Sequence, residues 1–393
     1  MGMKLKPADR IAGLPPYLFA AIDQMKQEAI RQGKDIINLG VGDPDLPTPP
    51  PVVRKLQQAA EDPKNHQYPS YEGLFIFRQA VSQWYQRRFG VALNPENEVQ
   101  TLIGSKEGIG HFPLAFINPG DIALIPTPGY PVYHAATLFA GGRSFFLPLL
   151  RENQFLPDLS LIPPKVLKSA RILFINYPNN PTSATATAEF FKSVVSFAER
   201  NNLIVCHDAA YSEIYFDGKR PESFLSTPGA KDVGIEFHSL SKTFNMTGWR
   251  IGFAVGNREV LSGLGKVKSN LDSGVFQAIQ EAGVYALSME ESAVDQIRKT
   301  YQERRDVFVT GLRGLGFDVS APQASFYVWV PIPRGTGSAE FTALLLAKTS
   351  IVSTPGKGFG EAGEGYIRLT LTVRKERLAE AIDRIEKAGI RGS

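Results

Sequence analysis

The sequence predicts an α/β fold in which a mostly parallel central sheet is flanked by helices, together with a smaller α+β domain. The first observation is a series of short, continuously apolar runs between about residues 95 and 260 that alternate with amphipathic stretches. The second is a change of pattern after Gly316, where strand-like and helical stretches are mixed. The third is the composition: 393 residues, 43% hydrophobic and 21% charged, are typical of a globular chain of two or three domains and exclude disordered and fibrous classes.

Six apolar runs are the expected strands of the central sheet: VQTLIG (99–104), IALIP (122–126), RILFINY (171–177), LIVCHD (203–208), IEFHSL (235–240) and RIGFAVG (250–256). Helical patterns such as TAEFFKSVVSFAERNN (187–202) separate the first five. Apolar strands separated by helices indicate a parallel sheet covered on both faces. Only a short stretch separates the last two runs, so one of them is a candidate for an antiparallel strand.

The rest of the chain predicts the second domain. Residues 259–313 have a helical pattern, and after them come the strand-like FDVSAPQASFYVWVPIP, the helical EFTALLLAKTS, the strand GYIRLTL and the closing helix KERLAEAIDRIEKAG. The Pro-rich GDPDLPTPPP (42–51) is typical of a linker, so the first 45 residues or so are expected to join the C-terminal part. We therefore expect a large domain at 48–285 and a small domain formed by 1–47 and 286–393.

Charge and cysteine content bound the partners and the compartment. Forty-three Lys and Arg residues against 39 Asp and Glu leave a net charge of +4 without a block of like charge, so nucleic acid is a poor candidate partner. Cys206 is the one cysteine and cannot form an internal disulfide. The chain has no signal-like apolar segment and no apolar run near the ~18 residues of a membrane span. We expect a cytoplasmic protein with no membrane partner.

Four polar features follow the expected strands, at the end where open parallel sheets bind ligands. They are the turn GSKEG (104–108), the turn NNPT (179–182), Asp208 with Tyr211, and Lys242 in SLSKT (239–243) with Arg250 beyond it. Small residues at a helix start let backbone N–H groups approach an anion. A desolvated lysine has a lowered pKa and offers a neutral amine for Schiff-base chemistry.

Each feature also has an ordinary explanation. GSKEG is common as a loop-to-helix turn, Asn-Pro favours a plain turn, Asp208 can cap the next helix, and Lys242 can be a solvated surface residue. Together, however, the anion-binding turn, amide, carboxylate, phenol and amine match one cofactor, pyridoxal 5′-phosphate. This cofactor requires an amine for its aldehyde, an acid for its ring nitrogen, donors for its phenolate and a cage for its phosphate.

These motifs resemble those of the class I/II, fold-type I, pyridoxal-phosphate-dependent aminotransferases over essentially the whole chain. The resemblance implies that Lys242 forms the Schiff base and catalyses the 1,3-proton shift, that Asp208 pairs with the pyridine nitrogen, and that Tyr211 bonds the ring oxygen O3′. The other residues that it implies for cofactor binding are Asn180 at O3′, Tyr130 stacked on the ring, and Ser105, Lys106, Ser239, Ser241 and Arg250, most of them at the phosphate.

The resemblance also implies substrate residues and a partner subunit. Arg368 in GYIRLTL matches the arginine that binds the substrate α-carboxylate, and Gly42 in LGVGDPD matches a glycine on the substrate side, where Tyr130 and Asn180 are also expected. Tyr71 in QYPSYEG matches a phosphate-binding tyrosine supplied by the neighbouring subunit. A homodimer with shared sites, acting on amino acids and 2-oxo acids, is therefore implied.

Within the family, GSKEGIGHFPLAFINPGD, CHDAAYSEIYFDG and GIEFHSLSKTFNMTGWRIGFAVGN are most similar to the members that convert LL-2,6-diaminopimelate and 2-oxoglutarate to tetrahydrodipicolinate and glutamate, toward lysine and cell-wall precursors. Tyr17 in PYLF matches a substrate-contacting tyrosine of the partner subunit in these enzymes. We expect Glu72 to approach the distal ammonium across the dimer interface, and Lys106 or Tyr17 to meet a distal carboxylate. The alternative is that Glu72 is a solvated turn residue and Lys106 only supports phosphate binding.

Other functions stay open. An aminotransferase for aspartate, alanine or aromatic amino acids shares every cofactor residue, and a pyridoxal-phosphate-dependent lyase shares the fold. A dinucleotide-binding oxidoreductase is disfavoured because GSKEG is not GxGxxG. The histidines His111, His207 and His238 show no ligand spacing, so we expect no metal. Ser183 stands where the family motif has glycine, which puts only the tightness of that turn in doubt.

Overall fold

The computed structural model describes residues 6–14 and 18–392, and its centre is a seven-stranded sheet of order β2-β8-β7-β6-β5-β3-β4. The strands are β2 (Val99–Leu102), β3 (Ile122–Thr127), β4 (Arg143–Pro148), β5 (Ala170–Asn176), β6 (Ile204–Asp208), β7 (Gly234–Ser239) and β8 (Gly252–Gly256). All neighbours pair in parallel except β8, which is antiparallel to both β2 and β7. The short connection 240–251 holds only one helical turn before the 3₁₀ turn, so it cannot carry the crossover that a parallel pair needs. The expected antiparallel strand is thus confirmed.

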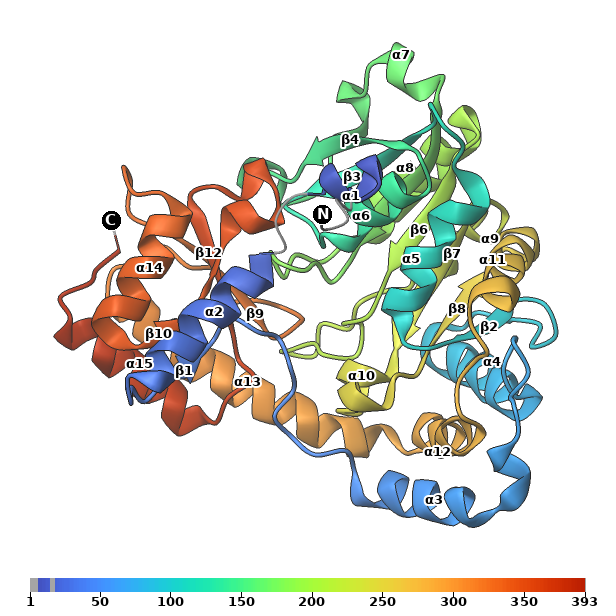
Figure 1. The fold of residues 1–393 in the computed structure, drawn as a ribbon, viewed down its shortest axis with the longest axis horizontal. Coiled ribbons are helices and arrows are strands. Elements are labelled where there is room, and N and C mark those ends of the chain that lie inside the picture. The colour runs from blue at the N-terminus through green and yellow to red at the C-terminus, as the bar shows by residue number, and fades with distance from the viewer. Residues whose placement is uncertain (1–5, 15–17, 393) are drawn as a thin grey trace, which may run out of the picture.

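Helices cover both faces of this sheet (Figure 1). The helices of this body are α3 (Pro50–Glu61), α4 (Phe75–Phe89), α5 (Ser105–Phe116), α6 (Val132–Phe139), α7 (Pro164–Leu167), α8 (Ala188–Asn201), α9 (Ala230–Val233), α10 (Leu240–Thr243), α11 (Arg258–Leu271) and α12 (Gln277–Ser288). Alternate residues of each strand pack on opposite faces: Ile172 and Phe174 of β5 meet the core of α5, α6 and α11, whereas Leu173 and Ile175 meet the core of α4, α8 and α12. The mostly parallel α/β architecture is confirmed.

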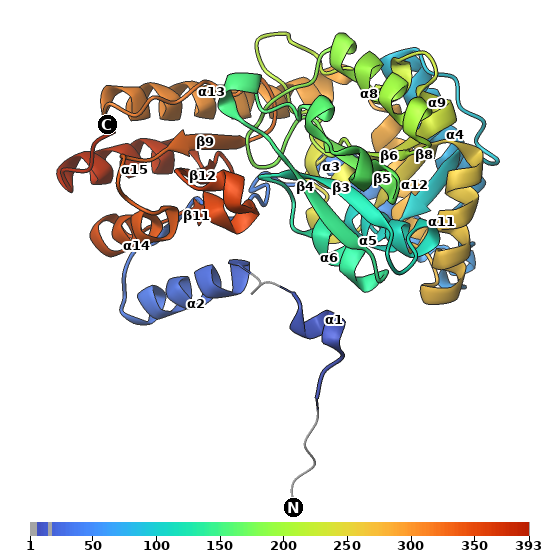
Figure 2. The same cartoon turned by 90° about the horizontal axis from the view of Figure 1, so that it is seen from above.

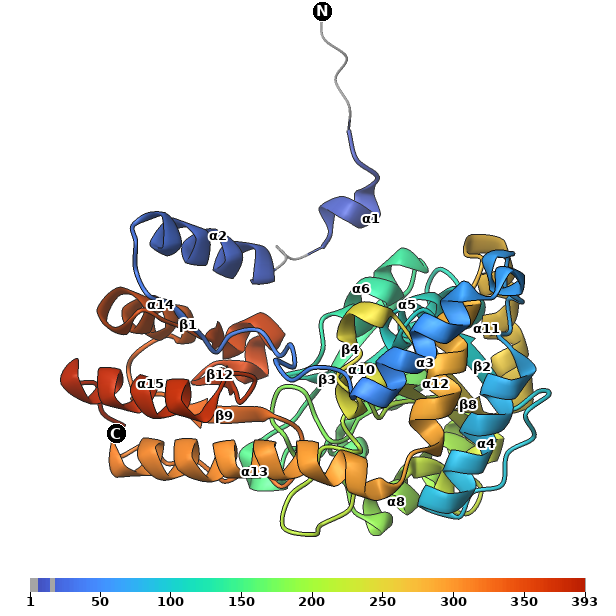
Figure 3. The ribbon, with the colours of Figure 1, turned by 90° about the horizontal axis from the view of Figure 1, so that it is seen from below.

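A smaller α+β body lies beside the large one (Figures 1 and 3). Its strands are β1 (Ile37–Asn38), parallel to β10 (Ile351–Val352), and the antiparallel set β11 (Thr354–Pro355), β12 (Tyr366–Thr370) and β9 (Tyr327–Pro331). Its helices are α2 (Leu18–Arg31), α13 (Glu291–Gly314), α14 (Ser338–Thr349) and α15 (Lys375–Lys387). A separate hydrophobic core joins β1, β9, β10, β12, α13, α14 and α15, and Tyr211, Ile214 and Phe216 also contribute to it. The chain after β1 and helix α13 both connect the two bodies.

The N-terminal helix α1 (Asp9–Ala12) has no buried residue and stands away from both bodies in Figure 2. Over the part of the chain that the structure describes, no helix combines the length and apolar character needed to span a bilayer.

Two sequence predictions differ from the structure. Residues 259–313 form three helices, because extended residues at Asp272 and Met289 end α11 and α12. Strand β4 was not among the expected strands, and it is the edge strand of the sheet, with most of its side chains partly or fully exposed. An edge strand that is not covered on both faces lacks the continuous apolar signal of its neighbours.

Candidate functional site

The candidate site lies at the carboxyl ends of β2, β5, β6 and β7, which meet at one edge of the sheet. Asp208 is the last residue of β6. Ser239 closes β7 and caps α10, the turn of helix that carries Lys242. The turn with Asn180 follows β5, and α5 begins directly after Gly104 beyond β2. The topology therefore brings all four predicted features together.

The Asp208 carboxylate is buried, with 5% of the residue exposed. Its Oδ2 accepts a hydrogen bond from the Tyr133 hydroxyl at 2.8 Å, and its Oδ1 accepts a long one from the Ala210 N–H at 3.4 Å. The Asn176 amide donates to the Asp208 carbonyl at 2.7 Å and fixes the strand end. Burial raises the pKa of Asp208, and the hydrogen bond from Tyr133 opposes that shift. A buried carboxylate with so few donors is suited to a cationic partner.

The Lys242 amine lies where the two bodies meet. Its Nζ donates to the carbonyl of Gly42 at 3.1 Å and lies 5.7 Å from the centre of the Phe326 ring. Burial lowers the pKa of Lys242 to about 8, and the positive charges of Arg250 and Arg368 act in the same direction against the opposing effect of Asp43. The amine is therefore substantially neutral at mildly alkaline pH and can act as a nucleophile.

A cradle for an anion surrounds the start of α5. Gly104 precedes this helix with φ of 73°, and a Cβ there would lie 2.2 Å from Nη2 of Arg250. A Cβ at Gly252 would lie 2.9 Å from the backbone nitrogen of Ser105. The Ser241 hydroxyl is buried and has no hydrogen-bond partner among residues 6–14 and 18–392. Free backbone N–H groups at a helix start, a nearby guanidinium and an unsatisfied hydroxyl fit a phosphate group.

The remaining predicted phosphate residues border this cradle. Ser239 is buried, and its hydroxyl accepts from the N–H of Ser241 at 3.2 Å. The Arg250 side chain is held by the carbonyls of Thr247 at 2.9 Å and Ile103 at 3.5 Å. Lys106, the second residue of α5, is exposed.

Arg368 lies on β12 with 2% of the residue exposed. It donates to Oδ1 of Asn180 at 2.8 Å and to the carbonyl of Gly40 at 2.7 Å, so it joins the small body to the turn after β5. Its guanidinium lies 4.2 Å from the centre of the Tyr327 ring and 4.7 Å from that of Phe359. A rigid, buried guanidinium of this kind suits bidentate binding of a carboxylate.

Two tyrosines join the site that the sequence prediction did not include. The first is Tyr327, whose hydroxyl lies 2.9 Å from the Tyr211 hydroxyl. A Cβ at position 42 would lie 2.3 Å from the Tyr327 hydroxyl oxygen, so only glycine fits at Gly42. The second is Tyr133, which bonds Asp208. It lies in the first turn of α6, whereas Tyr130 precedes that helix. No sequence signal marks either tyrosine as part of the site, because their contacts join elements that are distant in the sequence.

The Tyr130 ring lies near this group, 5.8 Å from the Tyr133 ring at an interplanar angle of 84°. Tyr71 and Glu72 lie instead in an exposed turn. Within its own chain the Glu72 carboxylate forms an ion pair with Arg78 at 3.5 Å. Tyr17 lies outside the described residues.

The turn after β5 is formed although Ser183 stands where the family motif has glycine. It adopts φ of 61°, and its hydroxyl donates to the carbonyl of Tyr327 at 2.8 Å. This hydrogen bond across the two bodies offsets part of the cost of a left-handed conformation at a non-glycine residue.

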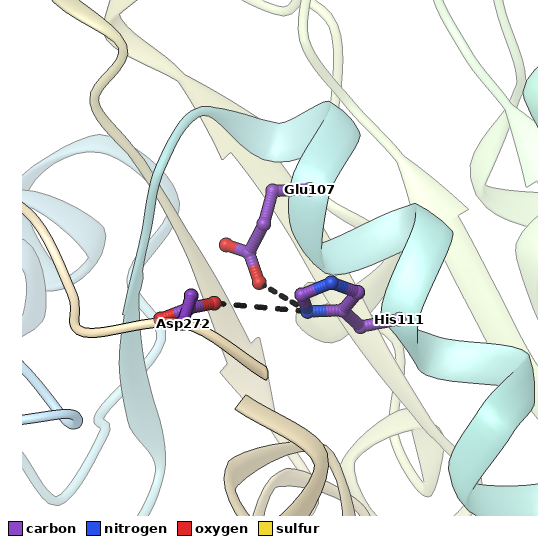
Figure 4. A group of neighbouring side chains, drawn as sticks. All are labelled: Glu107, His111 and Asp272. Carbon is purple, nitrogen blue, oxygen red and sulfur yellow. Dashed lines mark ion pairs between the residues drawn. The ribbon is translucent and has the colours of Figure 1, made fainter. Parts of the chain in front are cut away.

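His111 does meet two carboxylates, contrary to the expectation from spacing. Glu107, one helical turn away, and Asp272, far along the chain, place oxygens 2.7 and 3.8 Å from its Nδ1 (Figure 4). The three residues lie close enough to hold an ion. However, the buried Lys268 ammonium lies 3.1 Å from Glu107 and 3.0 Å from Asp272, and it already forms an ion pair with each of these carboxylates. The cluster therefore has the character of an ion-pair network between α5 and α11.

Comparison with known proteins agrees with this geometry. The family model described as "Aminotransferase class I and II" matches residues 34–385. Proteins named LL-diaminopimelate aminotransferase are 59% identical in Syntrophobacter fumaroxidans, over 98% of this chain and 99% of the relative, and 57% identical in Aquifex aeolicus, over 96% and 98%. Substrate-bound BacF from Bacillus subtilis superimposes with a TM-score of 0.96 at 39% identity, covering 100% of both chains. A probable N-succinyldiaminopimelate aminotransferase from Thermus thermophilus has a TM-score of 0.90 at 35% identity, covering 94% of this chain and 100% of its own.

Proposed function

Because the chain belongs to the class I and II aminotransferases, we propose that it transfers an amino group from LL-2,6-diaminopimelate to 2-oxoglutarate and yields tetrahydrodipicolinate and glutamate. The observation that supports this substrate is the nearly full-length similarity to enzymes named for it. The reaction class has independent physical support: a lysine amine with a pKa lowered to about 8 and a buried carboxylate at the same sheet edge.

The proposed cofactor is pyridoxal 5′-phosphate, which when bound supplies an aldehyde and a ring that accepts electrons from the substrate Cα. Lys242 would hold the aldehyde and Asp208 the protonated ring nitrogen. Tyr211 and Asn180 would bond the ring hydroxyl, and Tyr130 would stack on the ring. The phosphate would be held by Ser105, Lys106, Ser239, Ser241 and Arg250, with Tyr71 of a second copy.

The proposed roles of the chain's own residues follow from their positions. Arg368 binds the substrate α-carboxylate and thereby orients the Cα–H bond. Lys242, once its amine is free, would take the proton from the substrate Cα and deliver it to the aldehyde-derived carbon of the cofactor, because its lowered pKa lets it act as base and then as acid. Asp208 would keep a proton on the ring nitrogen by charge pairing. Gly42 leaves the space that the substrate requires next to Tyr327.

The proposal includes two domains and a homodimer. The large, cofactor-binding domain is proposed at 48–285 and the small one at 1–47 with 286–393, but Ala286 and Leu287 at the end of α12 still pack in the core of the large body. Exposed apolar side chains gather on two segments beside the phosphate cradle, and a second copy would cover them: Tyr68, Tyr71, Phe75 and Ile76 on one, Leu271 and Phe276 on the other. The two segments are in contact, since Gln277 donates to the carbonyl of Gln67 at 3.3 Å.

Mixing two inactive variants tests the shared site. Tyr71→Ala and Lys242→Ala homodimers are each expected to lack most activity, whereas hybrids contain one site with both native residues. Recovery of up to about half the wild-type activity per hybrid supports exchange of Tyr71 between subunits. A mixture that stays inactive although mass analysis shows hybrids would contradict it.

The distal pocket is tested at Glu72. If Glu72 binds the distal ammonium, Glu72→Gln reduces turnover with diaminopimelate more than with glutamate, because only diaminopimelate carries that ammonium. An equal loss of turnover with both donors would contradict a role of Glu72 in binding the distal ammonium, and its ion pair with Arg78 would be its only assigned contact.

A panel of amino donors tests the function as a whole. Purified protein is assayed with 2-oxoglutarate and LL-diaminopimelate, meso-diaminopimelate, aspartate, alanine or an aromatic amino acid, with glutamate formation as the readout. Highest kcat/KM with LL-diaminopimelate supports the proposal, and a preference for another donor would replace the substrate. Release of ammonia without an oxo acid would indicate a lyase. Lys242→Ala is expected to lose turnover and the cofactor absorbance together.

A further inference from the structure

A second buried carboxylate lies on the opposite face of the sheet from Asp208. Glu236 on β7 is fully buried, and β7 pairs it directly with His207 of β6. Its two oxygens accept hydrogen bonds from four side chains: Tyr85 at 2.9 Å, His238 Nε2 at 2.8 Å, His207 Nδ1 at 3.1 Å and Ser223 at 3.0 Å. Burial raises the pKa of Glu236, but its hydrogen bonds with His207 and His238 lower it well below its ordinary value. The four side-chain donors on its two oxygens favour the ionised form. An ionised carboxylate in this position requires a buried cation.

The hydrogen bonds of the two histidines identify that cation. His207 Nδ1 faces the Glu236 carboxylate, and its Nε2 lies 3.0 Å from the carbonyl of Tyr177, so both ring nitrogens face groups that can only accept. His238 differs: its Nε2 faces Glu236, but its Nδ1 lies 3.4 Å from the Ser212 hydroxyl, which can donate. His207 therefore needs two protons, whereas His238 is satisfied by one.

We propose that His207 carries protons on both ring nitrogens and pairs with Glu236 as an imidazolium, and that this charge, one residue before Asp208, is a positioning device that keeps Asp208 ionised for its ring-nitrogen partner. This role for Asp208 rests on the proposed function, but the charge of His207 does not. The groups that contact the pair are Tyr85 of α4, Ser223, His238 and the N–H of Leu225, whereas the neighbouring Cys206 thiol packs in the core on the other face of the sheet. Among them only Glu236 carries a negative charge, so it is the counter-ion of His207.

The connection to Asp208 is electrostatic. Burial raises the pKa of Asp208, and the hydrogen bonds from Tyr133 and Ala210 and the positive charge of His207 oppose this shift. Because the side chains of successive strand residues point to opposite faces, His207 acts without occupying the cofactor face. It can thus adjust the carboxylate without obstructing the ligand.

Nitrogen-15 NMR of histidine side chains in the holoenzyme at about pH 8 tests the charge directly. At this pH an ordinary histidine is neutral. We expect one ring with both nitrogens protonated, lost in His207→Gln, and a single-protonated ring for His238, lost in His238→Gln. If His207→Gln does not fold, substitution of the four other histidines assigns the signal by elimination. A singly protonated His207 would overturn the proposal, and no substrate enters this measurement.

Two further readouts test the pairing and its effect. The thermal stabilities of His207→Gln, Glu236→Gln and the double variant form a double-mutant cycle. If the two residues form an ion pair, the double variant loses less stability than the sum of the two single variants, because each single variant leaves one buried charge without its partner. Additive changes would overturn the pairing. The pH at which the bound cofactor changes absorbance should shift more in His207→Gln than in the matched His238→Gln, and equal shifts would overturn the effect on Asp208. If the cofactor binds but diaminopimelate is not used, the proposed substrate fails and this inference stands.

Discussion

Asp208 and Glu236 are two buried carboxylates on adjacent strands of one sheet, yet their surroundings have opposite effects. Asp208 receives one side-chain hydrogen bond from the described residues, and burial raises its pKa. Glu236 receives four, two of them from histidines, and its pKa is lowered. We infer from this difference that a buried charge with few hydrogen-bond donors indicates a ligand site, whereas a buried charge with many donors indicates a structural network.

Asp208→Asn should have the largest effect on turnover. The amide keeps the shape and can still accept from Tyr133, but it removes the charge that a cationic ring nitrogen requires. We expect kcat to fall by roughly 10²–10³-fold, with little change in stability, since the native carboxylate has few partners to lose. Steady-state kinetics and thermal unfolding of the same samples measure both. A large loss of stability with near-normal kcat would mean that Asp208 has a structural role like that of Glu236.

Glu236→Gln should show the reverse pattern. It leaves the charge on His207 buried without its counter-ion, which costs about 3–5 kcal/mol of stability. Denaturant unfolding of the variant measures this cost. Turnover of the protein that remains folded should fall much less than in Asp208→Asn. A variant as stable as the wild type would mean that the His207 proton leaves together with the charge of Glu236.

The contrast between these carboxylates also marks what the sequence could predict. The apolar runs predicted the parallel sheet, and the four strand-end features identified Asp208 and Lys242, because period and position along a strand are local properties. Tyr133 and Tyr327 could not be found in this way, since their contacts with Asp208 and Tyr211 depend on how distant elements pack.

Other misses have the same cause. The pairing of His207 with Glu236 depends on the register between β6 and β7, which residue spacing does not reveal. Edge strand β4 lacked the signal of burial on both faces.

Lys242 lies at the same edge of the sheet as Asp208, and burial shifts the pKa of its amine as well. Because its pKa is about 8 and not the ordinary 10.5, the neutral fraction of its amine should fall about tenfold for each pH unit below 8 and level off above it. The rate at which apoprotein captures pyridoxal phosphate, followed by absorbance, should show this dependence. Asp208→Asn is the matched control and should keep the same midpoint, since Asp208 is not among the main causes of the shift. A midpoint near 10.5 would contradict the desolvated amine.

The smallest expected effects come from two phenols that each donate to one of the carboxylates. Tyr133→Phe removes a 2.8 Å hydrogen bond to Asp208, and Tyr85→Phe removes a 2.9 Å hydrogen bond to Glu236. Both rings are buried, so loss of packing is equal to first order. A hydrogen bond to a charged group contributes about 1.5–3 kcal/mol.

The two losses should appear in different measurements. Tyr133→Phe further raises the pKa of Asp208 and should lower kcat by about tenfold while the unfolding midpoint moves little. Tyr85→Phe should lower the unfolding midpoint and keep kcat within about twofold, because Glu236 retains three other side-chain donors. Equal effects of the two variants on both quantities would mean that the two faces of the sheet are not functionally distinct.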